Sequence, residues 1–338
     1  MYGVSFPGES SSSSLQISEL GFGCSAVAGR VSRKESLLAL HAAYDAGITL
    51  YDTARSYGYG QSEHVVGDFL EGRRDTVVLC TKFGIMPVAM GGWKQKLRPM
   101  AQLAVRALPG LRAVAQKQLK DQFVPNQFTP EILRVSLETS LRELKTDYVD
   151  MLLLHAAPVT VLQQHDLLDA MDRLVQSGKV RVAGISGDLP VIETYFAERP
   201  KPLRTAQFSL NLSNLGFTAS SRQNGDLLLV GNHVFGGPGG VAAGKAMLSK
   251  LVASPDVPAD LQEKLDLNDP QTVPEVVLNC VLRGTGLTAI VPAMMQLRHI
   301  ESNVKALEQC RFADHEIAFL QRYFTDTSQP ADLPTVAS

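Results

Sequence analysis

The segment Tyr148-Val149-Asp150-Met151-Leu152-Leu153-Leu154-His155 decides the fold class. Apart from Asp150, every position up to Leu154 is hydrophobic or aromatic, which is typical of a parallel strand buried on both faces. An amphipathic helix precedes it, opened by Thr129-Pro130 as N-cap and first helical residue. Leucines then recur at helical spacing, at Leu133, Leu137, Leu141 and Leu144. A buried strand after such a helix indicates an α/β fold.

The same alternation extends along the chain in both directions from this segment. Seven further strand-sized apolar runs occur at Leu20–Cys24, Ile48–Tyr51, Thr76–Cys80, Val180–Ile185, Arg204–Leu210, Leu227–Val230 and Thr288–Val291. Eight strands alternating with helices predict an α/β (β/α)8 TIM barrel, and an open doubly wound sheet is the second choice. Residues 20–23 contain only a lone Gly-x-Gly, which argues against the doubly wound sheet.

We expect residues 1–338 to form one barrel domain with three additions. A run of five serines at 10–14 marks an N-terminal extension. Residues 85–128 are a long insertion, or lid, after the third strand, placed over the active-site rim. Residues 326–338 are expected to be a loose C-terminal tail. The polar stretch 211–226 predicts an irregular sixth crossover.

Composition excludes several classes of protein. The 338 residues include 32 Lys and Arg against 34 Asp and Glu, so a net charge of −2 gives no indication of nucleic acid as a partner. Four cysteines lie scattered without metal-ligand spacing, which favours buried thiols over disulfides or a metal site. Neither a signal peptide nor a membrane span is evident, so a cytoplasmic protein is expected.

Polar side chains follow three of the expected strands, at the ends where a barrel carries its chemistry. Asp52 and Tyr57 follow the second strand, Lys82 ends the third, and His155 ends the fourth. Taken singly, each has a structural explanation such as a turn cap or a core histidine. Together they form a set that tunes a phenol, because an ammonium lowers the pKa of a nearby tyrosine and a carboxylate holds that ammonium.

These segments resemble the aldo-keto reductase superfamily over roughly residues 15–310. The resemblance rests on Asp52-Thr53-Ala54-Arg55-Ser56-Tyr57-Gly58 with Glu63 and Gly67 beyond, on Thr81-Lys82-Phe83-Gly84, and on Leu152-Leu153-Leu154-His155. It implies a nicotinamide-dependent oxidoreductase that acts on a carbonyl or alcohol substrate. The implied catalytic tetrad is Asp52, Tyr57, Lys82 and His155, with Tyr57 as general acid or base.

The resemblance also implies a cofactor site. Its matching residues are Ser186, Gln207, Asn232, Gly236, Gly237, Arg298 and Asn303. Two departures are visible, because Gly187 stands where the family carries an asparagine, and the phosphate-binding positions hold Ala293, Met294 and His299. Arg298, one place away, is a suitable partner for a 2′-phosphate, so NADP (NADPH) is preferred over NAD. Cys24 and Trp93 are expected at the substrate pocket.

Other functions remain open at this point. One is a cofactor-binding regulatory or scaffold subunit, and another is a redox-assisted lyase or epimerase on the same barrel. The insertion carries seven basic and no acidic residues between Trp93 and Lys120, with apolar residues at helical spacing, which predicts amphipathic helices that cover the barrel. Binding to an anionic membrane surface and electrostatic selection of an acidic substrate are the two alternatives. As partners we expect a small-molecule carbonyl or alcohol substrate, with no nucleic acid, no membrane span and no metal, in a monomer or small homo-oligomer.

Overall fold

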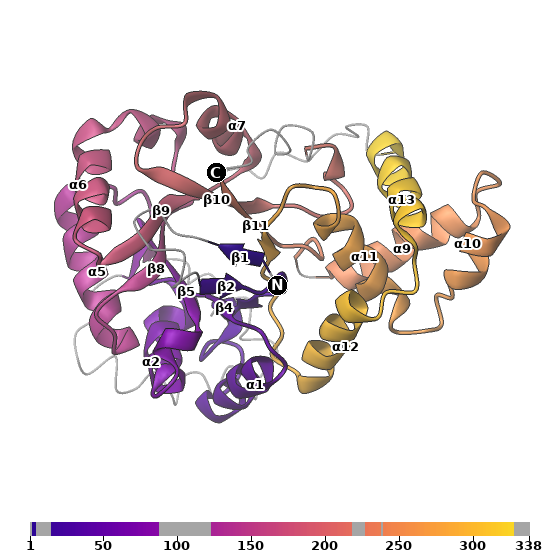
Figure 1. Cartoon of the computed structure of the whole chain (residues 1–338), viewed down its shortest axis with the longest axis horizontal. Helices are drawn as coiled ribbons and strands as arrows, with labels where there is room; N and C mark the ends of the chain where they lie inside the picture. The colour runs from indigo at the N-terminus through magenta and orange to yellow at the C-terminus, as the bar shows by residue number, and fades with distance from the viewer. Residues whose placement is uncertain (1, 5–14, 88–122, 218–226, 238, 328–338) are drawn as a thin grey trace, which may run out of the picture.

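A computed structural model describes residues 2–4, 15–87, 123–217, 227–237 and 239–327 (Figure 1). Eight parallel strands lie in the order β12-β11-β10-β9-β8-β5-β4-β3, so each strand neighbours the next one in the barrel sequence. Their bounds are β3 (Phe22–Gly23), β4 (Leu50–Asp52), β5 (Val78–Phe83), β8 (Val149–His155), β9 (Val180–Ser186), β10 (Leu203–Ser209), β11 (Leu228–Asn232) and β12 (Ala289–Ile290). All eight expected strands are therefore confirmed.

The sheet closes on itself. Leu20, just before β3, pairs in parallel with Ile290 of β12, and the Gly21 N–H donates to the Ile290 carbonyl at 2.7 Å. Sequential strand order with closure is the (β/α)8 barrel, and it rules out the doubly wound alternative.

Helices surround the strands, as the ring in Figure 1 shows. The helices are α1 (Arg33–Asp45), α2 (Ser62–Leu70), α5 (Pro130–Leu144), α6 (His165–Gln176), α7 (Leu189–Glu198), α9 (Gly240–Val252), α10 (Ala259–Lys264), α11 (Thr272–Leu282), α12 (Leu297–Glu308) and α13 (Asp314–Thr327). Thr129 caps α5 by accepting from the Ile132 N–H, as the sequence predicted. Within the described part of 211–226, only the short 3-10 turn Leu215–Phe217 forms, which agrees with an irregular crossover.

Strand alternation separates the core into two layers. One cluster, with Leu50, Cys80, Met151 and Val182 among its members, fills the inside of the barrel, and the much larger cluster lies between strands and helices. Positions two residues along from these inner residues also point inward. That parity directs Asp52, Lys82 and His155 to the barrel axis.

The three additions are only partly described. Strands β1 (Tyr2–Val4) and β2 (Leu15–Ile17) pair antiparallel across the centre of the ring in Figure 1. The insertion begins and ends in an antiparallel pair, β6 (Met86–Pro87) with β7 (Phe123–Val124), and its basic segment lies outside the described residues. Helix α13 runs to Thr327, two residues into the tail expected from 326, whose remainder is also outside them. In the described part of the chain, no helix is long and apolar enough to cross a membrane.

Candidate active site

Six side chains predicted for the site lie at the carboxyl ends of consecutive strands. Asp52 ends β4, Lys82 is next to last in β5, and His155 ends β8. Ser186 ends β9, Gln207 lies near the end of β10, and Asn232 ends β11. Strand register places His155 opposite Ser186, and Ser186 opposite Gln207. One rim of the barrel therefore carries them all.

Lys82 is the centre of this rim. Its Nζ donates three hydrogen bonds, to Asp52 Oδ1 at 2.6 Å, to the Thr53 carbonyl at 3.0 Å and to the Tyr57 hydroxyl at 3.2 Å. All three N–H groups are thus used, as the burial of the side chain, which is 0% exposed, requires. Burial alone would lower the pKa of Lys82, but the Asp52 carboxylate raises it above its ordinary value, so the ammonium stays charged.

Tyr57 sits in a tight turn that needs glycine. It opens the 3-10 segment Tyr57–Gly60, in which Gly58 has φ 57°. A Cβ on Gly58 would lie 2.2 Å from the Val27 carbonyl oxygen, so only glycine allows this approach. The turn is also fixed by Glu63, which accepts from Arg55 at 2.8 Å and from Thr81 at 2.6 Å. Sequence reasoning did not find this buried Arg55–Glu63 pair, although opposite charges flank the turn.

The electrostatics of Tyr57 differ from the simple expectation. Burial raises the pKa of Tyr57 above its ordinary value, and the Lys82 ammonium offsets only part of that rise. Lys82 therefore lowers the pKa of Tyr57, as expected, but burial raises it by more. The phenol is protonated at neutral pH and is able to donate its proton.

His155 completes the set across from Tyr57. The two rings meet edge to face with centroids 5.7 Å apart. Burial, with a smaller contribution from the Lys82 ammonium, lowers the pKa of His155 to about 3, so the imidazole is neutral at physiological pH. Its Nδ1 is buried without a hydrogen-bond partner among the described residues. A neutral imidazole has one N–H donor and one acceptor nitrogen, which suits it to orient an oxygen of a bound molecule.

This low pKa predicts a pH-dependent loss of stability. An unfolded histidine has a pKa of about 6.5. Between pH 6.5 and 3, therefore, the histidine is protonated in the unfolded chain but stays neutral in the folded chain. Stability therefore falls as pH falls through this window. Relative to a His155→Gln variant, the native chain should lose about 2 kcal/mol of unfolding free energy from pH 7 to pH 5. Urea titrations at both pH values measure it, and parallel losses in the two proteins would contradict the assignment.

A hydrogen-bonded chain links the next two residues to Asp52. Ser186 Oγ donates to Gln207 Oε1 at 2.9 Å, and Gln207 Nε2 donates to Asp52 Oδ1 at 2.9 Å. All three side chains are buried. The residues expected at the nicotinamide and the residues expected at the reacting oxygen therefore form one network, which the sequence did not indicate.

A glycine cradle lies beyond this network, after β11. Gly236, Gly237 and Gly239 all have positive φ, and a Cβ on Gly240 would lie 1.4 Å from the Phe235 carbonyl oxygen. Gly239 precedes the 13-residue helix α9, and within the described ranges no capping side chain bonds the first N–H groups of this helix. A cavity of about 150 Å³ opens between this loop and Asn211. Free N–H groups at a helix N-terminus suit a phosphate.

The remaining predicted residues belong to the cofactor site and the substrate pocket. Arg298 and Asn303 both lie on α12, where Arg298 is exposed and Asn303 is buried. Asn232 Oδ1 contacts His233 Nδ1 at 3.0 Å. Cys24 was expected at the substrate pocket, and this role stays a prediction. It is 0% exposed, belongs to the outer core, and its Sγ donates to the Phe22 carbonyl. Trp93 lies outside the described residues.

Buried or half-buried free thiols are found at all four cysteines, as expected. Across the described ranges, no three His, Cys, Asp or Glu side chains gather to hold a metal ion.

The sequence and the fold of this chain are similar to those of known aldo-keto reductases. The model of the aldo/keto reductase family matches residues 19–233. The chain is 31% identical over 205 residues to the aldo-keto reductase YhdN of Bacillus subtilis, an alignment of 59% of this chain and 51% of that protein. It spans about half the length of the first curated relatives that it matches.

Two solved structures share the fold. The holo form of the aldo-keto reductase AKR11C1 from Bacillus halodurans superimposes with a TM-score of 0.68 at 20% identity, covering 99% of each chain. An aldo/keto reductase from Klebsiella pneumoniae, solved with NADP and acetate, gives a TM-score of 0.65 at 24% identity and covers 91% of this chain and 92% of that one. At these identities the likeness establishes the barrel.

Proposed function

Because the chain belongs to the aldo/keto reductase family, we propose that it is an NADP-dependent oxidoreductase that interconverts a carbonyl compound and its alcohol. The observation that carries the proposal is the Lys82 ammonium, which bonds Asp52 Oδ1 and the Tyr57 hydroxyl together in a buried position. A half-buried phenol beside a fixed cation is equipped to exchange a proton with a substrate oxygen.

In this proposal the residues of the rim divide the work. The nicotinamide supplies or accepts hydride at the carbonyl carbon when bound. In reduction, Tyr57 gives its hydroxyl proton to the carbonyl oxygen, and the Lys82 ammonium stabilises the phenolate left behind. The neutral His155 orients the same oxygen with its ring N–H. Asp52 keeps the ammonium in place, and Gln207 in turn holds the Asp52 carboxylate.

The described residues fit a dinucleotide. Gln207 and Ser186 would bind the nicotinamide carboxamide, since each retains hydrogen-bonding capacity beyond the single bond that joins them. The cradle of Gly236, Gly237 and Gly239 would bind the pyrophosphate, because a Cβ would obstruct it or be strained there. Asn303 and Arg298 would bind the adenosine end. The Klebsiella protein with bound NADP supports this choice of cofactor.

Two measurements test the function. Fluorescence titrations with NADPH and NADH should give the tighter dissociation constant for NADPH. With 4-nitrobenzaldehyde, oxidation of NADPH and formation of the alcohol should then proceed in equal amounts. Binding without turnover would favour a regulatory or scaffold subunit, and product formation without net NADPH oxidation would favour the lyase or epimerase.

Arg298 offers a separate test of the cofactor assignment. Its Nε donates to Gln296 at 2.8 Å, which leaves the other guanidinium N–H groups available at an exposed position on α12. We expect Arg298→Ala to weaken NADPH binding by about 1–3 kcal/mol and to leave NADH binding unchanged. The native preference for NADPH should be below about tenfold, since the neighbouring positions carry no permanent cation. Equal losses for both cofactors would show that Arg298 does not contact the 2′-phosphate.

A further inference from the structure

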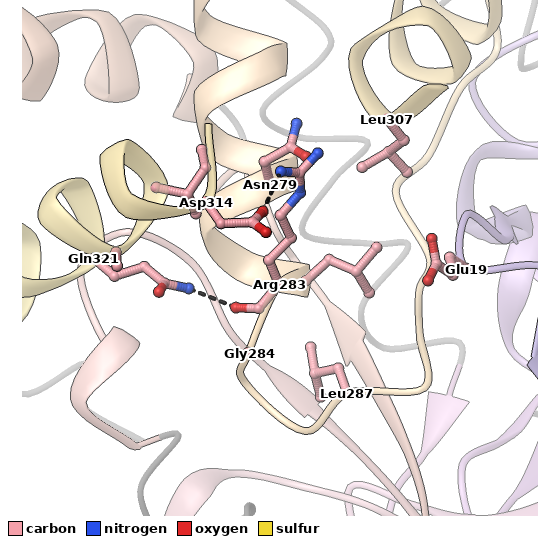
Figure 2. A pocket seen from close by; sticks show the side chains of 11 residues that line it. Glu19, Asn279, Arg283, Gly284, Leu287, Leu307, Asp314 and Gln321 are labelled. Atoms are coloured by element: carbon pink, nitrogen blue, oxygen red, sulfur yellow. Dashed lines mark hydrogen bonds and ion pairs between the residues drawn. The ribbon is translucent and has the colours of Figure 1, made fainter. Parts of the chain in front are cut away.

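A cavity of about 570 Å³ lies away from the catalytic rim, among α11, α12, α13 and the loop that leads into β12 (Figure 2). Glu19 precedes β3 and Leu287 precedes β12, so the cavity lies beside the amino ends of these strands. Asp52 and His155 end their strands at the opposite face of the barrel. Its volume is that of a small-molecule site.

Apolar and polar side chains both line this cavity. Leu282, Leu287 and Ile317 are buried lining residues, and Leu307 closes the side next to α12. Such walls bind an apolar body, and the polar groups decide which polar ends it carries.

Asn279 contributes an unsatisfied acceptor. The side chain is 0% exposed, and its Nδ2 donates to the Glu275 and Ala306 carbonyls, each at 2.8 Å. Those two bonds fix the amide orientation, because the reversed amide would place its oxygen against two carbonyls. Asn279 Oδ1 is consequently left buried without a donor among the described residues. A buried acceptor without a partner costs about 1–3 kcal/mol, which a ligand N–H or O–H would recover.

The charges of the lining favour a cation. Figure 2 shows the Glu19 carboxylate directed into the cavity, and within the described ranges it has no hydrogen-bond or ion-pair partner. The Arg283 guanidinium is already paired with Asp314, at 2.9 Å. The Glu19 and Asp314 carboxylates and the Arg283 guanidinium together give the lining a formal charge of −1. Because Arg283 pairs with Asp314, Glu19 is the carboxylate without a counterion among the described residues.

We propose that this cavity is a second binding site, for an amphipathic organic amine. The protonated amine pairs with Glu19, the apolar body packs against Leu282, Leu287 and Ile317, and a second N–H or O–H group donates to Asn279 Oδ1. This site is separate from the oxidoreductase chemistry and does not depend on it.

Calorimetric titration of the full chain with tyramine tests the proposal, because tyramine has an ammonium, an apolar ring and a hydroxyl donor. Phloretic acid, which carries a carboxylate in place of the ammonium, should bind at least about tenfold more weakly, and phenethylamine, without the hydroxyl, several-fold more weakly. Equal affinity for tyramine and phloretic acid, or no measurable binding of tyramine, would overturn the proposal.

Three variants locate the site. Glu19→Gln should weaken tyramine at least about tenfold. Glu263→Gln is the matched control, since it removes an equal charge from an exposed position on α10 that does not line the cavity, and it should change affinity less than about twofold. Ala318→Trp, at an exposed lining position of α13, should fill the cavity and abolish binding. Tyramine affinity that is unchanged in Glu19→Gln or Ala318→Trp would place the amine elsewhere and refute the site.

Discussion

Replacing Tyr57 with Phe is expected to lower kcat for carbonyl reduction by about 10²–10⁴-fold, the usual contribution of a general acid. The change removes the hydroxyl that accepts from Lys82 Nζ at 3.2 Å and leaves the ring against His155. NADPH binding should stay within about twofold, because Tyr57 is not among the residues assigned to the cofactor. Steady-state kinetics and a fluorescence titration measure the two effects.

Tyr44→Phe is the matched control for that experiment. It also removes a tyrosine hydroxyl, but one that bonds Thr76 in an exposed position on the outside of the barrel. Its kcat should equal that of the native chain. If Tyr57→Phe retained near-native turnover, another group would be the proton donor.

Burial defines the pH range in which this chemistry works. The pKa of Tyr57 lies above its ordinary value because the phenol is buried, so the protonated donor persists through neutral and mildly alkaline pH. Reduction should decline only as pH rises through that pKa, whereas alcohol oxidation, which needs the phenolate, should increase there. His155, with its pKa near 3, stays neutral over the whole range and does not add a second pH limb above pH 5.

The sequence was sufficient for the strands and for the direction of their side chains. Alternation along β5 puts Val78, Cys80 and Lys82 on one side, and a charged residue in that series had to lie inside the barrel near its end. The same period applied to β4 and β8 brings Asp52 and His155 to Lys82. Local patterns were enough because parallel neighbours in a closed sheet share one rim.

The contacts that depend on side-chain placement could not be predicted in this way. The bond from Gln207 to Asp52 joins residues 155 apart, on strands that are not neighbours in the sheet, so it needs the diameter of the barrel as well as the strand order. Cys24 follows the first barrel strand at the start of a 3-10 segment, and its side chain belongs to the outer cluster together with Phe22 and Tyr51. The net pKa of Tyr57 depended on its burial, which motif spacing does not reveal.

Lys82→Met is the second substitution with a large expected effect, and it separates tuning from simple packing. The ammonium lowers the pKa of Tyr57 relative to burial alone, so its removal should raise that pKa further. Reduction should slow by about 10²–10⁴-fold because a weaker acid donates less readily. The alkaline limb of the pH profile should also move to higher pH, a shift that a purely structural role of Lys82 would not produce.

The same substitution removes the ammonium that neutralises the buried Asp52 carboxylate, although Gln207 Nε2 still donates to it. The loss is expected to destabilise the fold by about 3–5 kcal/mol. The double variant Asp52→Asn with Lys82→Met removes both charges and should recover most of that stability in urea denaturation. Its activity should stay low, with the alkaline limb still displaced, because the Lys82 ammonium, the group that stabilises the phenolate, is absent. Recovery of activity together with stability would mean that Lys82 acts only by holding Asp52, and the assignment of Lys82 as the group that tunes Tyr57 would be wrong.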